Sequence, residues 1–354
     1  MLSRSKVFYT SLNSPVLWAA IVFIRSKRIS PDKIRSPFPR ILLSGASGMI
    51  GTALQRALPA RRFSALQLVR TREPVNVNPR AVVVAIPGQF PWNPAATPPI
   101  ASPLVLEGFA AAIHLSGANV AAHRWTASYK REMAASRVQS TRALAETLAG
   151  LRNPPQTFLV ASAIGIYGNR GDELLDESSA PGSGFLADLC RQWEAAAQPA
   201  VDAGIRVVHL RFGVILGPGP GALAKMLPIF RLGLGGPLGS GRQWMSWISL
   251  DDVIAAILFI LDAETLAGPI NLTSPNPVTN TQLTSALAAA VHRPAVLPAP
   301  AFALRLALGQ MADEALLASA RAVPTRLLAA GFQFAHPTVA EALAAALLPH
   351  PALS

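Results

Sequence analysis

Cysteine is almost absent from this chain, which has a single one, Cys190, in 354 residues. One thiol excludes an internal disulfide and is typical of a reducing compartment, so we expect a cytoplasmic protein. Cysteine and histidine do not cluster at metal-ligand spacing, and we expect no metal site. Long hydrophobic runs are missing as well. The longest, VLWAAIVFI at residues 16–24, is about half of the roughly 20 residues that a transmembrane helix needs, so we expect no such helix.

Acidic residues are scarce, with 19 Asp and Glu against 31 Lys and Arg and a net charge of +12. The excess is uneven, because residues 1–40 hold eight Lys and Arg and one acid, Asp32, a balance of +7, and the other 314 residues contribute +5. A basic segment of this kind can serve in targeting or bind an anionic lipid surface or nucleic acid. We predict that residues 1–36 are a disordered extension. Since no nucleic-acid recognition motif accompanies them, we expect no nucleic-acid partner.

Short apolar runs alternate with helical patterns through the first 210 residues. The apolar runs lie at 41–43, 65–69, 111–115, 158–161 and 206–210, and the helical patterns include 126–149 and 186–203. This alternation predicts an α/β fold with a doubly wound parallel sheet, the Rossmann arrangement.

The composition of the sequence changes after about residue 212. Gly and Pro crowd residues 213–241, and Ala- and Leu-rich helical patterns follow. We therefore predict a nucleotide-binding domain over residues 37–250. We assign residues 251–354 to the remainder of a small substrate lobe, with a helical domain at about 300–350.

A glycine-rich turn follows the first apolar run directly: residues 45–51 read GASGMIG, with the spacing GxxGxxG. Glycines there permit a tight turn and let backbone N–H groups approach a pyrophosphate at a helix N-terminus. The preceding strand and the following helix are the context that makes so short a motif informative. The sequence thus predicts a dinucleotide site.

The end of the second apolar run distinguishes between the two nicotinamide cofactors. Arg70 lies 19 residues after Gly51, and no acid precedes Glu73 in this stretch. An acid there would bind the ribose hydroxyls of NAD, whereas a cation accommodates the 2′-phosphate of NADP. We predict NADP(H), although a solvent-exposed surface arginine would give the same pattern.

Further motifs carry a family resemblance. They are HLSGAN at 114–119, RWT at 124–126, SRV at 136–138, WEAAA at 193–197, GLGGPLGSG at 233–241, WISLDD at 247–252 and GFQF at 331–334. From about Ile41 to Leu348 the chain resembles the extended short-chain dehydrogenase/reductase superfamily. Within it, the chain is most similar to the atypical "epimerase family" branch, which has a C-terminal domain of unknown function.

The resemblance implies an NADP(H)-dependent epimerase or oxidoreductase that acts on a small polar substrate. It also implies a set of cofactor-binding residues: Gly45, Ser47, Gly48, Met49, Ile50, Gly51, Arg70, Leu115, Ser116, Gly117, Glu132 and Arg137. Arg137 replaces a structural Asn of mainstream members. Ser249 replaces a histidine that is usual in the branch. For Glu132 and Arg137, an exposed helix face is the alternative interpretation.

The usual catalytic pair of that superfamily, Tyr-x-x-x-Lys, is missing. None of Tyr9, Tyr129 and Tyr167 is followed four positions later by lysine. In the segment that should carry the pair, Leu186 and Cys190 occupy the two positions. Leucine cannot transfer a proton, and a neutral thiol is a poor substitute for a lysine charge. The chemistry therefore needs a non-standard proton relay.

Two side chains after the fourth apolar run remain as catalytic candidates. Ser162 could orient a substrate oxygen or relay a proton, and Tyr167 could act as a surrogate acid or be only structural. The predicted wall of the substrate pocket consists of Trp125, Arg211, Arg242 and Trp247. Arginines and aromatic rings there would suit an anionic small molecule, and either tryptophan could equally be a core residue. The loss of the Tyr–Lys pair leaves a second hypothesis open, a non-catalytic NADP(H)-binding sensor or scaffold.

Overall fold

Seven parallel strands form the central sheet of the computed structural model, which describes residues 38–71, 88–100 and 102–348. The predicted N-terminal extension, residues 1–36, lies outside the described residues. The strands are β1 (Arg40–Ser44), β2 (Ser64–Arg70), β3 (Gln89–Trp92), β4 (Ala111–His114), β5 (Thr157–Ala163), β7 (Arg206–Phe212) and β11 (Gly268–Leu272). Their order is β11-β7-β5-β4-β1-β2-β3. The predicted doubly wound parallel sheet is confirmed.

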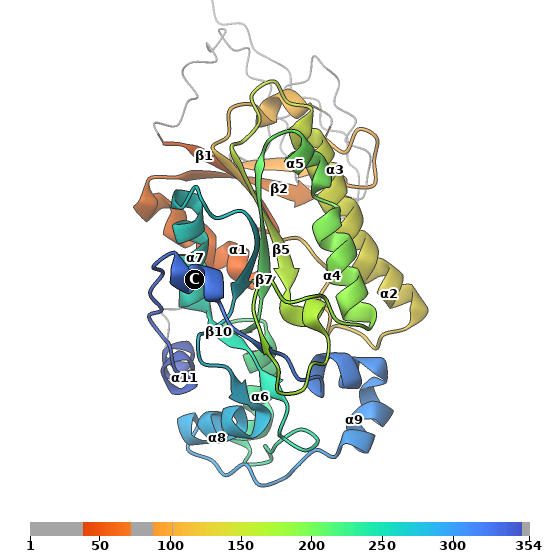
Figure 1. Ribbon diagram of the computed structural model, residues 1–354, viewed down its shortest axis with the longest axis vertical. Coiled ribbons are helices and arrows are strands. Elements are labelled where there is room, and N and C mark those ends of the chain that lie inside the picture. Colours follow the sequence, from red (N-terminus) through yellow and green to blue (C-terminus); the bar gives the residue numbers. More distant parts are fainter. Residues whose placement is uncertain (1–37, 72–87, 101, 349–354) are drawn as a thin grey trace, which may run out of the picture. The chain divides into compact units, whose positions relative to one another are not determined.

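Helices cover both faces of this sheet (Figure 1). They are α1 (Met49–Ala57), α2 (Ala127–Ala134), α3 (Ser140–Ala149), α4 (Phe185–Ala195), α5 (Gln198–Asp202) and α7 (Leu250–Asp262), with short 3-10 turns at Leu58–Arg61, Pro103–Leu106 and Ile164–Tyr167. The alternation of strand side chains decides the faces. Ile41 and Leu43 of β1 pack in the core beneath α1 and α7, and Leu42 packs in the core beneath α3 and α5.

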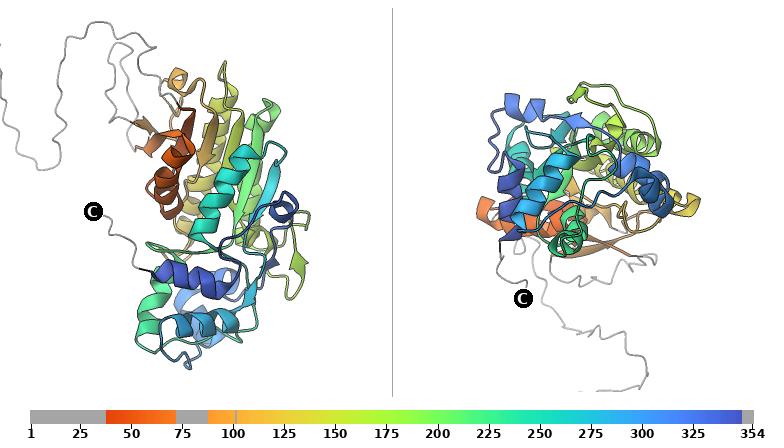
Figure 2. Two further views of the ribbon diagram at one scale, coloured as in Figure 1. Left: turned by 90° about the vertical axis from the view of Figure 1, so that its left-hand side faces the viewer. Right: turned by 90° about the horizontal axis from the view of Figure 1, so that it is seen from below.

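A smaller lobe follows the sheet. It contains α6 (Ala222–Arg231), α8 (Asn280–Ala290), α9 (Ala301–Leu308), α10 (Thr325–Ala329) and α11 (Val339–Leu347), with the short strands β6 (Leu174–Leu175), β8 (Val214–Leu216), β9 (Trp244–Met245), β10 (Trp247–Ser249), β12 (Val278–Thr279) and β13 (Arg321–Ala322). Helices α8 and α11 lie side by side in it and share one core (Figure 2). Pairs β8–β10 and β6–β13 are parallel, and β9–β12 is antiparallel.

The central sheet continues past residue 250, where the sequence places the domain boundary. Helix α7 buries Val253, Ala256 and Ile257 against the sheet, and β11 pairs with β7 as its edge strand. The central sheet therefore continues to Leu272, and the chain beyond it forms most of the small lobe and returns to the core of the sheet at Leu327 and Phe332. The sequence of a helix such as α7 indicates an apolar face, but it does not indicate which surface of the protein that face covers.

Within the described ranges, no helix has the length and apolarity required to cross a membrane. In the same part of the chain, no three His, Cys, Asp or Glu side chains are grouped so as to hold a metal ion.

Candidate cofactor and active site

The glycine turn between β1 and α1 is closed so tightly that side chains do not fit at two of its positions. A Cβ added to Gly45 would lie 2.7 Å from the carbonyl carbon of Leu115, and one added to Gly51 would lie 2.3 Å from the carbonyl oxygen of Gly45. Gly45 also has a φ of 74°, in the left-handed region that glycine adopts without strain. The turn thus brings the start of α1 against both β1 and the exit of β4.

This turn lies at the point where the strand order reverses. From β1 the chain proceeds to β2 on one side, and it later enters β4 on the other side. In open α/β sheets such a switch point is where ligands bind, beyond the carboxyl ends of the strands. Ser47 and Gly48 are exposed there, and Leu115 and Ser116 are partly buried. Helix α1 has no side-chain N-cap and no acid in its first turn, so its N-terminal N–H groups remain receptive to an anion.

Arg70 is the last residue of β2 and is exposed at the same edge of the sheet. That is the location that binding of a 2′-phosphate requires, and the role stays a prediction. Glu132 is exposed on α2, and among the described residues it has no hydrogen-bond partner. Its predicted link to the cofactor also remains a prediction.

Arg137, by contrast, is buried beside the exit of β4. Its Nη2 donates to Ala118 O at 2.7 Å, and its Cζ lies 5.0 Å from the centre of the Trp193 ring. A Cβ on Gly117 would lie 3.2 Å from this Cζ, so the guanidinium lies directly under the predicted cofactor loop. Arg137 sits in a π-helical turn, Ala135–Gln139, between α2 and α3. Such turns are frequent at functional sites.

The charge of Arg137 has no acidic partner. No carboxylate within the described ranges forms an ion pair with it, and burial lowers its pKa below the ordinary value for arginine. Guanidinium groups nevertheless remain protonated in proteins. A buried cation without a counter-ion, next to a glycine turn, is suited to an anionic ligand.

A buried ion pair lies under the end of β5. Ser162 Oγ donates to Glu194 Oε1 at 2.7 Å, and Arg211 binds both oxygens of the same carboxylate at 2.8 and 2.9 Å. Burial by itself would raise the pKa of Glu194, but the hydrogen bonds and charge of Arg211 outweigh burial and hold the pKa below its ordinary value. Glu194 is therefore an ionised acceptor behind Ser162.

Tyr167 extends this network and is enclosed by it. Its side chain is 0% exposed. Its hydroxyl accepts from Arg211 Nη1 at 3.0 Å and lies 2.8 Å from both Asn271 Oδ1 and Asp176 O. Burial raises its pKa above the ordinary value. A hydroxyl so enclosed favours the structural interpretation of Tyr167, and a role as surrogate acid stays a prediction.

Three of the four residues of the predicted substrate wall are buried, and their contact with a substrate stays a prediction. Trp247 is 0% exposed and donates from Nε1 to Asn276 O at 3.0 Å within the core of the small lobe. Trp125 is buried against Phe185, with ring centres 5.4 Å apart. The Arg211 guanidinium is engaged by Glu194 and Tyr167. Of the four predicted residues, Arg242 alone is exposed.

The two positions of the missing catalytic pair are packed against the end of β5. A Cβ on Gly165 would lie 3.4 Å from Leu186 Cβ and 3.9 Å from Cys190 Sγ. Cys190 is 3% exposed, and burial raises its pKa to about 12. It is a small apolar core residue here and not a nucleophile.

The N-terminus of α4, which carries Leu186, is capped from the small lobe. The Glu314 carboxylate, from the π-helical turn Ala312–Leu316, accepts from Phe185 N at 3.1 Å and from Leu186 N at 2.8 Å. A Cβ on Gly184 would lie 3.1 Å from Glu314 Cδ. Glu314 could not be predicted as the partner of Leu186 from the sequence, because 128 residues separate the two.

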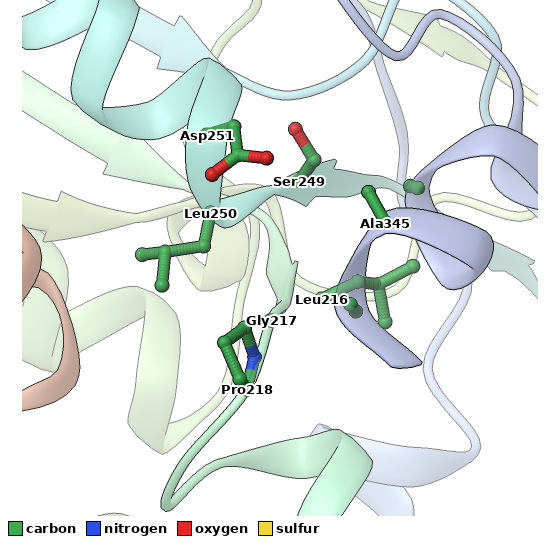
Figure 3. Close-up of a pocket in the computed structure, with 9 residues that line it drawn as sticks. Leu216, Gly217, Pro218, Ser249, Leu250, Asp251 and Ala345 are labelled. Carbon is green, nitrogen blue, oxygen red and sulfur yellow. The ribbon is translucent and has the colours of Figure 1, made fainter. Parts of the chain in front are cut away.

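A small crevice lies where β8 and α7 meet α11 (Figure 3). It is lined by Leu216, Gly217, Pro218, Ser249, Leu250, Asp251, Ala342, Ala345 and Ala346. Its volume of about 10 Å³ has room for one water molecule, which excludes it as a substrate pocket. The chain leaving this crevice returns to the glycine turn, since a Cβ on Gly221 would lie 3.5 Å from the Met49 thioether.

Comparisons with known proteins agree with this geometry. Residues 41–272 match the model of the NAD dependent epimerase/dehydratase family, and residues 299–346 match a domain of unknown function, DUF1731. An epimerase family protein of Mycobacterium bovis is 43% identical over 303 residues, 86% of this chain and 96% of the relative. The human epimerase family protein SDR39U1 is 33% identical over 307 residues, 86% of this chain and 98% of the relative.

A crystal structure of human SDR39U1, isoform 2, with NADPH has a TM-score of 0.76 to this chain at 31% identity, and it covers 87% of this chain and 98% of that one. These matches confirm the resemblance inferred from the motifs. The chain belongs to the NAD dependent epimerase/dehydratase family, as a member with a C-terminal DUF1731 domain.

Proposed function

We propose that this protein binds NADP(H) and catalyses an oxidoreductase or epimerase reaction on a small polar substrate. The observation that carries the proposal is the closed glycine turn at the switch point of the sheet, where a Cβ on Gly45 or Gly51 would collide with backbone. Arg137, a buried cation without an acidic partner, lies beside it. The relative solved with NADPH supports the choice of cofactor.

Residues of this chain would hold the cofactor at three places. The N–H groups at the start of α1 would bind the pyrophosphate. Arg70 would bind the 2′-phosphate, and Leu115 and Ser116 would line the exit of β4. When bound, the nicotinamide ring would supply the hydride acceptor or donor.

Ser162 and Glu194 would form the proton relay in place of Tyr and Lys. Arg211 keeps Glu194 ionised, so the carboxylate would orient the Ser162 hydroxyl as its hydrogen-bond acceptor and would hold its proton only transiently while Ser162 takes one from the substrate. Ser162 is 2% exposed, so a bound water would have to connect its hydroxyl with the substrate oxygen.

NADPH should raise the melting temperature of the protein more than NADH does at equal concentration, because the 2′-phosphate is expected to contact Arg70. A ligand at about 100 times its dissociation constant stabilises a protein by roughly 2.7 kcal/mol. Differential scanning fluorimetry of the wild type and of Arg70→Ala measures the effect, and the variant should respond equally to the two cofactors. Equal responses of the wild type would contradict the NADP(H) assignment.

Two control variants sharpen that experiment. Gly51→Ala should remove the response to both cofactors, since its Cβ meets the Gly45 carbonyl. Arg152→Ala changes an exposed arginine in the loop before β5, at the opposite edge of the sheet, and should respond as the wild type does.

A non-catalytic NADP(H)-binding sensor is the second candidate function. The observation that favours it is the packing at the end of β5. Leu186 and Cys190 fill the places of the catalytic Tyr and Lys there, and the Tyr167 hydroxyl is enclosed. Catalysis predicts that a panel of carbonyl compounds includes one that drives NADPH oxidation. Ser162→Ala should then slow this turnover at least about 100-fold while cofactor binding is retained. NADPH binding without turnover on any carbonyl would favour the sensor.

A further inference from the structure

The guanidinium of Arg321, in β13, has no hydrogen-bond acceptor among the described residues. Its Cζ lies 4.2 Å from the centre of the Trp244 ring. Its Nε is buried and has no hydrogen-bond partner among the described residues. No carboxylate in the described ranges forms an ion pair with it. A charged nitrogen removed from water without a partner is costly, so the position of this Nε is informative.

The other arginines that are buried or half-buried all have acceptors. In the described ranges they are Arg137, Arg170, Arg206, Arg211 and Arg326. Arg321 shares one property with Arg137 alone among them: the guanidinium lies over an indole ring and has no acidic partner. Arg137 lies beside the glycine turn, whereas Arg321 lies in the small lobe.

The segment that carries Arg321 lies close to the carboxyl ends of β5 and β7. Ala322 packs with Ile166 and Tyr167, which follow β5. Ser246 Oγ bonds to the carbonyls of Ala320 and Ala322, and a Cβ on Gly213, directly after β7, would lie 2.6 Å from Ser246 O. Arg321 is therefore held near the end of the sheet where the reaction would take place.

Hydrogen bonds fix the position of Trp244, the residue whose ring lies against the Arg321 guanidinium. Trp244 Nε1 donates to Asp172 Oδ1 at 2.8 Å, and Trp244 N donates to Ser319 Oγ at 3.0 Å. Asp172 is thus engaged by the indole and not by Arg321. Exposed Arg242, two residues before Trp244, adds a second positive charge to this region.

We propose that Arg321, stacked on Trp244, binds an oxyanion of the substrate, a carboxylate or a phosphate. A guanidinium lying on an aromatic face keeps its N–H edge free and fixed in direction, which suits bidentate binding of two oxygen atoms. The proposal rests on the proposed function and narrows its substrate to an anionic molecule.

Two probes test the site in protein saturated with NADPH: malonate for a carboxylate and inorganic pyrophosphate for a phosphate. Isothermal titration should show that one of them binds the wild type and identify the class. Arg321→Met should weaken that binding at least about tenfold while NADPH affinity is unchanged. Trp244→Leu should weaken it too, because the guanidinium then loses its platform. Arg142→Met, an exposed arginine of α3, is the matched control and should bind as the wild type does.

The outcomes separate this inference from the cofactor assignment. Binding of NADPH without binding of either probe, or probe binding that Arg321→Met leaves intact, overturns the oxyanion site only. A wild type that does not bind NADPH contradicts the proposed function instead. Should Arg321→Met not fold, Arg321→Lys keeps the charge without the two-pronged edge, and unchanged probe affinity in that variant would overturn the bidentate arrangement.

Discussion

Replacing Glu194 with alanine should lower the free energy of unfolding by about 3–5 kcal/mol. The reason is that the change leaves the buried charge of Arg211 without its partner. The Arg211 side chain is 7% exposed, and it would lose its two bonds to the carboxylate while remaining away from water. Ser162 would lose its acceptor at the same time. Urea unfolding at neutral pH measures the difference.

Two further variants show whether the lost stability belongs to the pair. Glu146→Ala breaks the exposed pair with Arg142 on α3 and should cost less than about 1 kcal/mol. The double variant Glu194→Leu with Arg211→Met removes both charges and should recover much of the loss, since apolar side chains can replace a buried ion pair. A loss below 1 kcal/mol in Glu194→Ala would show that Arg211 finds water or another acceptor.

Acidification from pH 7 to 4.5 should destabilise the protein by about 2.7 kcal/mol through His114 alone. This histidine is 0% exposed, and burial lowers its pKa from 6.5 to about 3. Between these two values the unfolded chain binds a proton that the folded protein does not, so stability rises with pH. The contribution is complete above about pH 6.5 and falls as the pH decreases toward 3.

Replacing His114 tests whether this residue causes the pH dependence. His114 connects Ser44 of β1 with Ser140 of α3 through its two ring nitrogens. His114→Gln removes the titration and should flatten the pH dependence of unfolding between pH 3 and 6.5, whatever its effect at neutral pH. His123→Gln changes an exposed histidine and should leave the slope as it is. Parallel curves for the wild type and His114→Gln would mean that the folded protein can protonate His114.

The parts of the site that are local in sequence were predictable. Gly45 and Gly51 are six residues apart, and the turn they make is dictated by backbone sterics that any chain obeys. Arg70 likewise follows from its distance to Gly51. The same holds for the alternation of strands and helices, because a parallel sheet is the arrangement that satisfies it.

Contacts between distant segments were not predictable. Tyr167 and Trp247 looked like possible site residues, but their burial depends on packing against strands and loops far along the chain. The role of Glu194 as the partner of Arg211 was missed because α4 and β7 meet only in the folded sheet. The edge strand β11 was missed because its five residues, GPINL, carry too little pattern to identify a strand.

The cap that Glu314 places on α4 affects how the two matched regions can be recombined. The family models divide the chain after residue 272 and resume at residue 299. The helix that carries Leu186 nevertheless begins at a carboxylate from beyond that division. A chimera with the C-terminal domain of another chain would preserve this helix terminus only if the donor brought an acid to the place of Glu314. The two regions match separate family models, but they have to be exchanged together if the cap on α4 is to be kept.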